Sequence, residues 1–255
     1  MLWRLRAAGL ALFLFLVAIP AAPATFKVSP IQIYLSAART TELLAVENQS
    51  SESVRLQVTA FGWNQSPRGE MELAPTEDVV FFPALLTLDA GKERKIRIGV
   101  SKPAGAVERT YRVFVEELPT LEKPSETGNR SEVKVLTRFG VPIFVQPAKL
   151  TRSGAIESAK LESGTVKFQV KNTGNAAFSL LSVRASGKGA DGSQTFESQA
   201  AGWYVLAGGE RAFEIAVPPA DCRQTKTISL EAKTERDAWK ASLAVAPEAC
   251  GPASR

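Results

Sequence analysis

Histidine is absent from the 255-residue chain, which limits the chemistry that its side chains support. Imidazole is the base of Ser-His-Asp and Cys-His sites and the usual nitrogen ligand of protein-bound metals. Close carboxylates are another route to hydrolysis, and Glu108, Glu116 and Glu117 lie near one another in the sequence. Such clusters are common by chance, so we expect structural roles for them. The sequence predicts a non-enzymatic protein with no metal or cofactor.

Two arginines, Arg112 and Arg138, lie in neighbouring β-rich segments, residues 111–117 and 131–145. A guanidinium group presents a rigid fork that matches a carboxylate, so the pair is a candidate site for an anionic group such as a chain terminus. The alternative is that each arginine pairs with a local acid, for example Glu116 or Glu132, or extends into water.

The only two cysteines are Cys222 and Cys250, and both lie late in the chain. In an exported protein an even pair predicts one disulfide. It would close a loop of about 29 residues and contribute on the order of 3 kcal/mol in the chain-entropy model. Two free thiols are the alternative.

Residues 131–145 read as one long β-strand whose two faces differ. Every second residue belongs to an almost wholly apolar row, made of Val133, Val135, Thr137, Phe139, Val141, Ile143 and Val145. The length exceeds the usual strand of about 5–6 residues, and Pro142 cannot donate to a ladder. If the half with Val133 and Val135 protrudes, it offers an open edge for β-augmentation; otherwise it is an ordinary last strand.

The first residues, 1–24, have the pattern of a cleaved signal peptide. Arg4 and Arg6 precede an apolar run over residues 7–19, and Ala22-Pro23-Ala24 follows. The run is too short to span a bilayer comfortably, so we expect an exported protein without membrane insertion, with a retained N-terminal anchor as the alternative. Without these two arginines the formal net charge falls from +5 to +3, which gives nucleic-acid binding little support.

The remaining chain is long enough for two domains, which we place at residues 25–147 and 148–255. Short β-rich segments bounded by Asn, Ser, Pro or Gly recur every 8–15 residues or so, without helical periodicity, which predicts an all-β chain with two immunoglobulin-like β-sandwiches. The link near residues 146–149 is very short, so we expect a fixed interdomain angle and a cleft. We expect core packing for Trp63, Trp203 and Trp239.

The order of several segments resembles the N-terminal domain of the periplasmic pilus-assembly chaperones. They are LAVEN at residues 44–48, LTLDAGKERKIRIGV at 86–100, YRVFVEELP at 111–119 and VLTRFGVPIFVQP at 135–147. The last two are similar, more narrowly, to the archaic branch of the chaperone-usher systems. The resemblance is specific over residues 26–147 and only architectural beyond them.

This resemblance implies a boomerang of two immunoglobulin-like domains that binds one pilus subunit in the periplasm and delivers it to an outer-membrane usher. Family chaperones complete the subunit's sandwich with the last strand of their first domain. Here the implied donor residues are Glu132, Val133, Lys134, Val135, Leu136 and Thr137. Val133 and Val135 would enter the subunit, with Leu136 as an alternative. The free protein could cover the same edge by self-association.

Classical members hold the subunit's terminal carboxylate with a first-strand arginine and a last-strand lysine. Here the first-strand position is Gln32 and the basic residue of the last strand is Arg138, so the resemblance points to Arg138 with Arg112 as the anchor. An exported two-domain adhesion or structural binding module is the alternative function.

Overall fold

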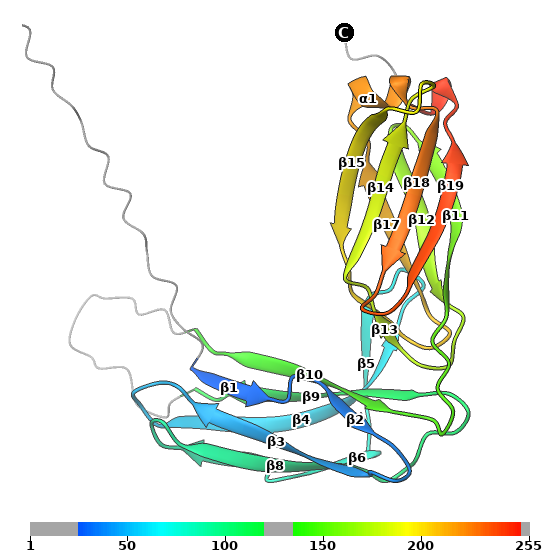
Figure 1. The fold of residues 1–255 in the computed structure, drawn as a ribbon. Helices are drawn as coiled ribbons and strands as arrows, with labels where there is room; N and C mark the ends of the chain where they lie inside the picture. Colours follow the sequence, from blue (N-terminus) through cyan, green and yellow to red (C-terminus); the bar gives the residue numbers. More distant parts are fainter. Residues whose placement is uncertain (1–24, 120–134, 251–255) are drawn as a thin grey trace, which may run out of the picture.

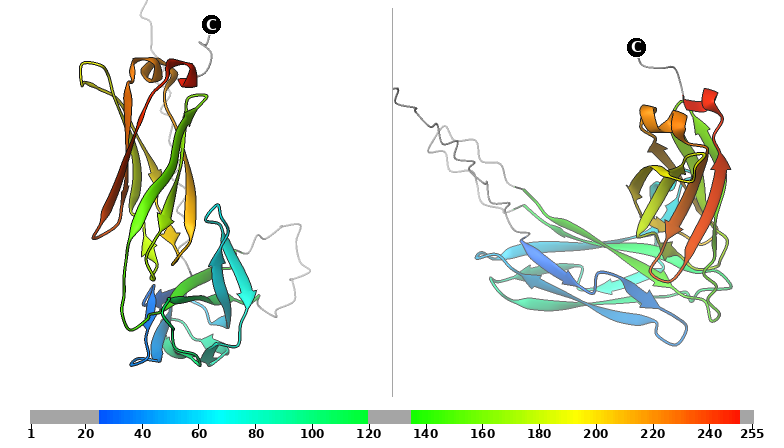
Figure 2. Two further views of the ribbon diagram at one scale, coloured as in Figure 1. Left: turned by 90° about the vertical axis from the view of Figure 1, so that its right-hand side faces the viewer. Right: turned by 45° about the horizontal axis from the view of Figure 1, so that its top comes forward.

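A computed structural model describes residues 25–119 and 135–250 of the chain. Its strands form two β-sandwiches that meet at one end, so the described part of the molecule is L-shaped (Figure 1 and Figure 2). The first sandwich contains β1 to β10 and the second β11 to β19. The predicted all-β fold, with two immunoglobulin-like sandwiches in a boomerang arrangement, is confirmed. The predicted signal peptide, residues 1–24, lies outside the described residues.

The first sandwich consists of two sheets that enclose one apolar core. One sheet has the order β1 (Phe26–Ser29), β3 (Thr41–Asn48), β8 (Glu93–Val100), β6 (Val79–Phe82). The other has the order β2 (Ile33–Leu35), β10 (Arg138–Val145), β9 (Arg109–Glu117), β4 (Val54–Gln65), β5 (Met71–Pro75), with β7 (Leu85–Leu88) also beside β4. Alternate residues face the core because side chains along a strand alternate between its two faces. Val113, Val115, Val141 and Ile143 are among the buried ones.

The N-terminal segment contributes to both sheets of this sandwich. β1 pairs with β3 in an antiparallel ladder, whereas β2 pairs with β10 in a parallel one. Pro30 lies between them, after a cis peptide bond. The chain therefore changes sheets at Pro30, which as a proline cannot donate to a ladder.

The second sandwich has two larger sheets and one short pairing. One sheet contains β11 (Gly154–Glu162), β12 (Thr165–Asn172) and β17 (Glu210–Ala216). The other contains β15 (Gln194–Ala201), β14 (Ser182–Lys188), β18 (Thr227–Lys233) and β19 (Ala238–Ala244). β13 (Phe178–Ser179) pairs with β16 (Tyr204–Val205) at the end near the first domain. Two short helices, α1 (Pro219–Gln224) and η1 (Pro247–Cys250), cover the far end.

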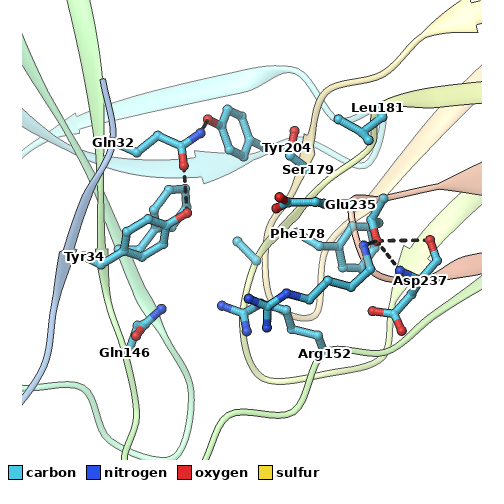
Figure 3. A pocket seen from close by; sticks show the side chains of 14 residues that line it. Gln32, Tyr34, Gln146, Arg152, Phe178, Ser179, Leu181, Tyr204, Glu235 and Asp237 are labelled. Atoms are coloured by element: carbon cyan, nitrogen blue, oxygen red, sulfur yellow. Dashed lines mark hydrogen bonds between the residues drawn. The ribbon is translucent and has the colours of Figure 1, made fainter. Parts of the chain in front are cut away.

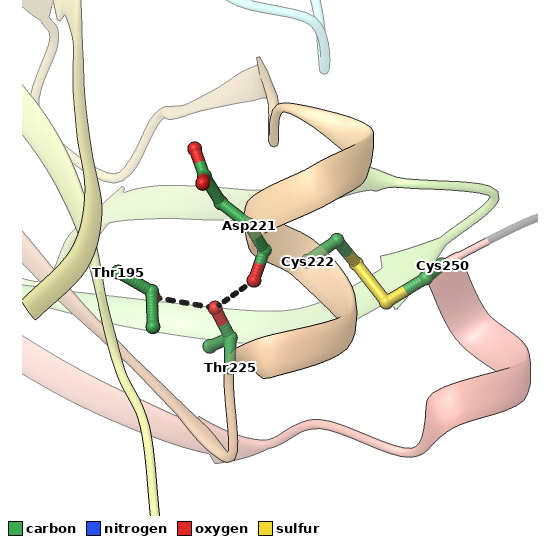
Figure 4. The surroundings of a disulfide bond; sticks show 5 residues. All are labelled: Thr195, Asp221, Cys222, Thr225 and Cys250. Atoms are coloured by element: carbon green, nitrogen blue, oxygen red, sulfur yellow. Dashed lines mark hydrogen bonds between the residues drawn. A yellow bond between two sulfur atoms is a disulfide. The ribbon is translucent and has the colours of Figure 1, made fainter.

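The two helices carry the disulfide between Cys222 and Cys250 (Figure 4). The predicted bridge is confirmed, with 5.8 Å between the two Cα atoms, and both cysteines are buried in the core of the second sandwich. The Thr225 hydroxyl donates to the Asp221 carbonyl at 2.8 Å and shares a 2.6 Å hydrogen bond with the hydroxyl of Thr195. These bonds fix α1 against β15.

A long hairpin of the first domain, formed by β4 and β5, braces the second domain (Figure 1). Gln65 bonds the backbone of Tyr204 and Leu206, each at 2.8 Å. Arg211 Nη1 donates to the carbonyl oxygen of Gly69 at 2.7 Å. Gly69 has a φ of 79°, and a Cβ there would lie 2.6 Å from the Arg211 side chain. The domains are therefore held by the hairpin as well as by the short link.

Within the described residues, no helix has the length and apolar composition needed to cross a membrane.

Candidate functional site

β10 has an incomplete set of neighbours. On one side it pairs with β9 along its whole length, from Arg138 to Val145. On the other side β2 pairs only with Ile143, Phe144 and Val145. Among the described residues, no strand pairs with the first part of β10 on that side. This part of the strand is an open edge, which natural proteins normally protect.

The backbone direction of each residue at this edge follows from the ladder with β9. The Thr137 carbonyl accepts from the Glu117 amide at 2.9 Å, so Thr137 and Glu117 form a hydrogen-bonded pair. Backbone groups of successive residues point to opposite sides of a strand, so those of Arg138 and Gly140 point to the open edge. Pro142 has the same parity but no amide hydrogen. Gly140 is therefore the last residue of this edge whose amide and carbonyl groups can both bond an added strand.

The structure describes half of the predicted donor segment. Glu132, Val133 and Lys134 lie outside the described residues. Val135 is 75% exposed and Leu136 is also exposed, and both precede β10 without belonging to a strand. The prediction of one continuous strand is therefore wrong for residues 135–137. The reason is that β9 ends at Glu117, opposite Thr137, so no neighbour remains for a longer ladder.

Arg112 lies on the outer face of β9, opposite Pro142 of β10 and Phe61 of β4. Its side chain is 7% exposed, and its guanidinium carbon lies 4.3 Å from the ring centroid of Trp63 and 5.6 Å from that of Trp203. Among the described residues Arg112 has no ion pair, and its Nε has no hydrogen-bond partner. Burial lowers the pKa of Arg112, although the group stays protonated at neutral pH.

Arg138 lies on the same face but has partners of its own. Its Nε is 3.2 Å from a carboxylate oxygen of Glu116, and its guanidinium carbon is 4.0 Å above the ring of Phe114. Gly140, on β10, lies between the side chains of Arg138 and Arg112. A Cβ at this position would lie 2.7 Å from the Phe114 ring and 3.4 Å from Nη1 of Arg112. The structure thus places both predicted arginines on one face, and the local-acid alternative holds for Arg138 alone.

The second domain covers Arg112 with two adjacent aromatic residues. Trp203 is 41% exposed, so the expected core packing is wrong for this tryptophan, which lies against the other domain. The Tyr204 ring packs on those of Trp63 and Phe144, and its hydroxyl accepts from Gln32 Nε2 at 2.6 Å. The sequence analysis assigned Trp203 to a core and did not identify Tyr204; the adjacent aromatic pair Trp203-Tyr204 is the signal that marks them.

A pocket of about 750 Å³ lies beside this site, between the end of β2 and the second domain (Figure 3). Its first-domain wall includes Gln32, Tyr34 and Gln146, and its second-domain wall includes Leu181 and Glu235. The Arg152 side chain extends into it from the segment between the domains (Figure 3). Arg152 and Glu235 are further residues that sequence reasoning did not identify.

The three clustered glutamates have separate structural roles. Glu108 is at the domain junction, where its carboxylate accepts from the Ala177 amide at 2.8 Å. Glu116 pairs with Arg138, and Glu117 accepts from the Thr25 hydroxyl at 2.8 Å. Burial raises the pKa of Glu108 to about 7, against the opposing effects of the Ala177 amide and of Arg152. The structural interpretation of this acid cluster is supported.

No group of three or more acidic or cysteine side chains suited to a metal ion occurs within the described residues.

Comparisons with known proteins agree with this architecture. Residues 25–151 match the PapD N-terminal domain of the pili and flagellar-assembly chaperones. The probable fimbrial chaperone EcpE of Escherichia coli O127:H6 is 27% identical over 196 residues, which cover 74% of this chain and 76% of EcpE. The probable fimbrial chaperone EcpB of Klebsiella pneumoniae strain 342 is 27% identical over 208 residues, with coverages of 80% and 87%.

Solved structures share the fold. A chain of the CsuC–CsuE chaperone–tip adhesion subunit pre-assembly complex of Acinetobacter baumannii superposes with a TM-score of 0.59 at 20% identity, covering 85% of this chain and 98% of that one. The class 5 fimbriae chaperone CfaA superposes with a TM-score of 0.54 at 18% identity, covering 85% of this chain and 98% of CfaA.

The chain belongs to the family of pili and flagellar-assembly chaperones. It is a chaperone rather than an enzyme.

Proposed function

We propose that this chaperone binds one pilus subunit in the periplasm, adds the open edge of β10 to the subunit's sheet, and delivers the subunit to an outer-membrane usher. The observation that carries the proposal is the edge itself. The backbone groups of Arg138 and Gly140 that point to this edge are not paired with any described strand, and the exposed Val135 precedes them on the same chain. An added strand would satisfy the backbone groups, while apolar side chains of the donor segment enter the subunit.

The donor segment remains the one predicted, from Glu132 to Thr137, with Val133 and Val135 directed into the subunit. The described part supports this parity. Val135 is separated by even steps from Phe139 and Val141, which face the core of the first sandwich. Leu136 has the parity of Arg138, on the outer face. Without a subunit, the same edge would be available to a second copy of the chain.

Arg112 is the main anchor for the subunit's terminal carboxylate in this proposal, and Arg138 assists it. A subunit strand along the open edge would run close to Pro142, and Arg112 is the residue opposite Pro142 on the next strand. A buried guanidinium without an acid among the described residues favours an incoming carboxylate. Arg138 would first have to release Glu116.

Co-expression with a pilus subunit encoded beside the chaperone tests the proposal. Val133→Asp combined with Val135→Asp should abolish recovery of the soluble subunit from the periplasm, because it places two charges in an apolar groove. Val80→Asp is the matched control: Val80 is also an exposed valine, but it lies on β6, in the other sheet of the first sandwich. Unchanged subunit recovery with the double variant would refute strand addition at this edge.

A further inference from the structure

The pocket between the domains begins where the open edge of β10 ends. β2 takes the place beside β10 from Ile143 onward, so a strand bound to the free part of the edge would be in line with β2. Such a strand, with its terminal carboxylate at Arg112, must end next to Gln32, the residue just before β2. Gln32 also lines the pocket, together with Tyr34 from β2. The part of the subunit that surrounds the end of this strand therefore faces the pocket.

Two opposite charges face this pocket without neutralising each other. The guanidinium of Arg152 and the carboxylate of Glu235 both line it, and Figure 3 shows both groups directed into the open space. Neither forms an ion pair with any residue that the structure describes. Leu181, which is 59% exposed, adds an apolar surface to the same lining.

This combination suits a dipolar protein segment. A ligand that fills the pocket displaces water, so its charges interact with Arg152 and Glu235 in a less polar medium than at an open surface. Charges of fixed sign at fixed places favour one arrangement of partner charges and penalise the reverse arrangement. The apolar contact alone would not discriminate between subunits in this way.

We propose that this pocket is a specificity site for the bound subunit: it takes a subunit segment that places an acidic side chain against Arg152, a basic side chain against Glu235 and an apolar group on Leu181. The inference rests on the proposed function, because it assumes that the subunit strand follows the edge of β10. It assigns to the second domain a part in choosing which subunit is bound.

Subunit exchange at equilibrium measures the effect. A neighbouring pilus subunit, purified in complex with labelled wild-type chaperone, is mixed with each unlabelled variant, and the partition gives relative affinities. Arg152→Glu and Glu235→Arg should each weaken binding roughly tenfold. Arg97→Glu is the control for charge reversal, because Arg97 is exposed on β8, in the other sheet of the first sandwich. It should partition as the wild type does.

The double variant, Arg152→Glu with Glu235→Arg, separates ligand binding from mutual pairing. If Arg152 and Glu235 bind charges of the subunit, exchanging them places like charges opposite each other. Binding by the double variant is then at least as weak as binding by the weaker of the two single variants. Restoration of wild-type affinity would mean that the two residues only attract each other, and would overturn the inference. If a charge reversal impairs folding, Arg152→Gln and Glu235→Gln replace it, with an expected weakening of roughly threefold.

Val135→Asp in the same assay distinguishes this inference from the proposed function. If Val135→Asp loses the subunit while all pocket variants hold it with wild-type affinity, only the specificity site is wrong. If Val135→Asp and the pocket variants all partition as the wild type does, the proposed strand addition fails as well.

Discussion

The guanidinium carbon of Arg112 lies 4.3 Å from the ring centroid of Trp63, on the face of the sheet that meets the second domain. Cation–π contact of this kind offsets part of the cost of burying the charge, but it supplies no counter-ion. The ring centroid of Trp203, from the second domain, lies 5.6 Å from the same carbon atom. The first domain therefore holds a buried positive charge that has no ion pair among the described residues, and the second domain contributes to its burial.

Replacing Arg112 by methionine should have opposite effects on folding and on binding. Loss of a buried charge that has no ion pair among the described residues is expected to leave the free energy of unfolding unchanged or to raise it by about 1 kcal/mol. Subunit affinity should fall roughly tenfold or more, because the carboxylate loses its partner. Denaturant titration and subunit exchange measure the two quantities. Arg138→Met is the comparison, with a smaller effect on binding; equal losses of affinity in both variants would deny Arg112 its leading role.

Gly140 is required because the Phe114 ring occupies the space beside it. In Gly140→Ala the new Cβ would lie 2.7 Å from that ring, so the ring must shift. The shift would disturb the contact between the ring and the Arg138 guanidinium. We expect a loss of about 1–3 kcal/mol in the free energy of unfolding. Gly105→Ala is the control, since nothing lies within 4 Å of a Cβ there. Similar thermal unfolding curves for the two variants would contradict this packing argument.

Glu108 should make the stability depend on pH near neutrality. Its folded-state pKa of about 7 is raised above the ordinary value of 4.5, so the folded protein holds this proton more tightly than the unfolded chain does. The protonated Glu108 carboxyl therefore adds to the free energy of unfolding below pH 4.5, and this contribution is lost as the pH rises from 4.5 through about 7. The total change is roughly 3 kcal/mol.

The variant Glu108→Gln isolates this effect, because an amide oxygen can still accept from Ala177. Its free energy of unfolding should exceed that of the wild type at pH 8 and match it more closely at pH 5. A difference between the two proteins that does not change over this range would show that burial does not perturb the Glu108 carboxyl.

The disulfide should stabilise the second domain without affecting binding. Cys222→Ser with Cys250→Ser removes the closure of a loop of about 29 residues, with an expected loss of about 3 kcal/mol. α1 and η1 lie at the end of the second domain that is remote from β10 (Figure 1). Subunit exchange under conditions where the variant stays folded should therefore give wild-type affinity, and a marked loss would contradict this separation.

The sequence predicts the sandwich strands well where burial alternates, as in Val113 and Val115 or Val141 and Ile143. It does not predict β5, because all five of its residues are exposed and it ends in a proline. It also misses α1, whose six residues are too few to show a helical period. Periodicity therefore does not predict elements that are short or whose residues are all exposed.

The candidate site could be predicted only in part. The sequence predicts that Arg112 and Arg138 act together, but their partners depend on strand register, which sets Arg138 opposite Glu116 and Arg112 opposite Pro142. Trp203 reaches Arg112 from the other domain. Its place there depends on the interdomain angle, which is set by contacts between residues distant in sequence, such as Gly69 and Arg211.

Amide hydrogen exchange of β10 tests the central claim most directly. In the free chaperone the amides of Arg138 and Gly140, which point to the open edge, should exchange fast, whereas that of Val141, which points to β9, should be protected. Binding of a pilus subunit should protect Arg138 and Gly140 and leave Val141 protected. If both edge amides still exchange fast in a stable complex, the subunit does not add a strand to β10.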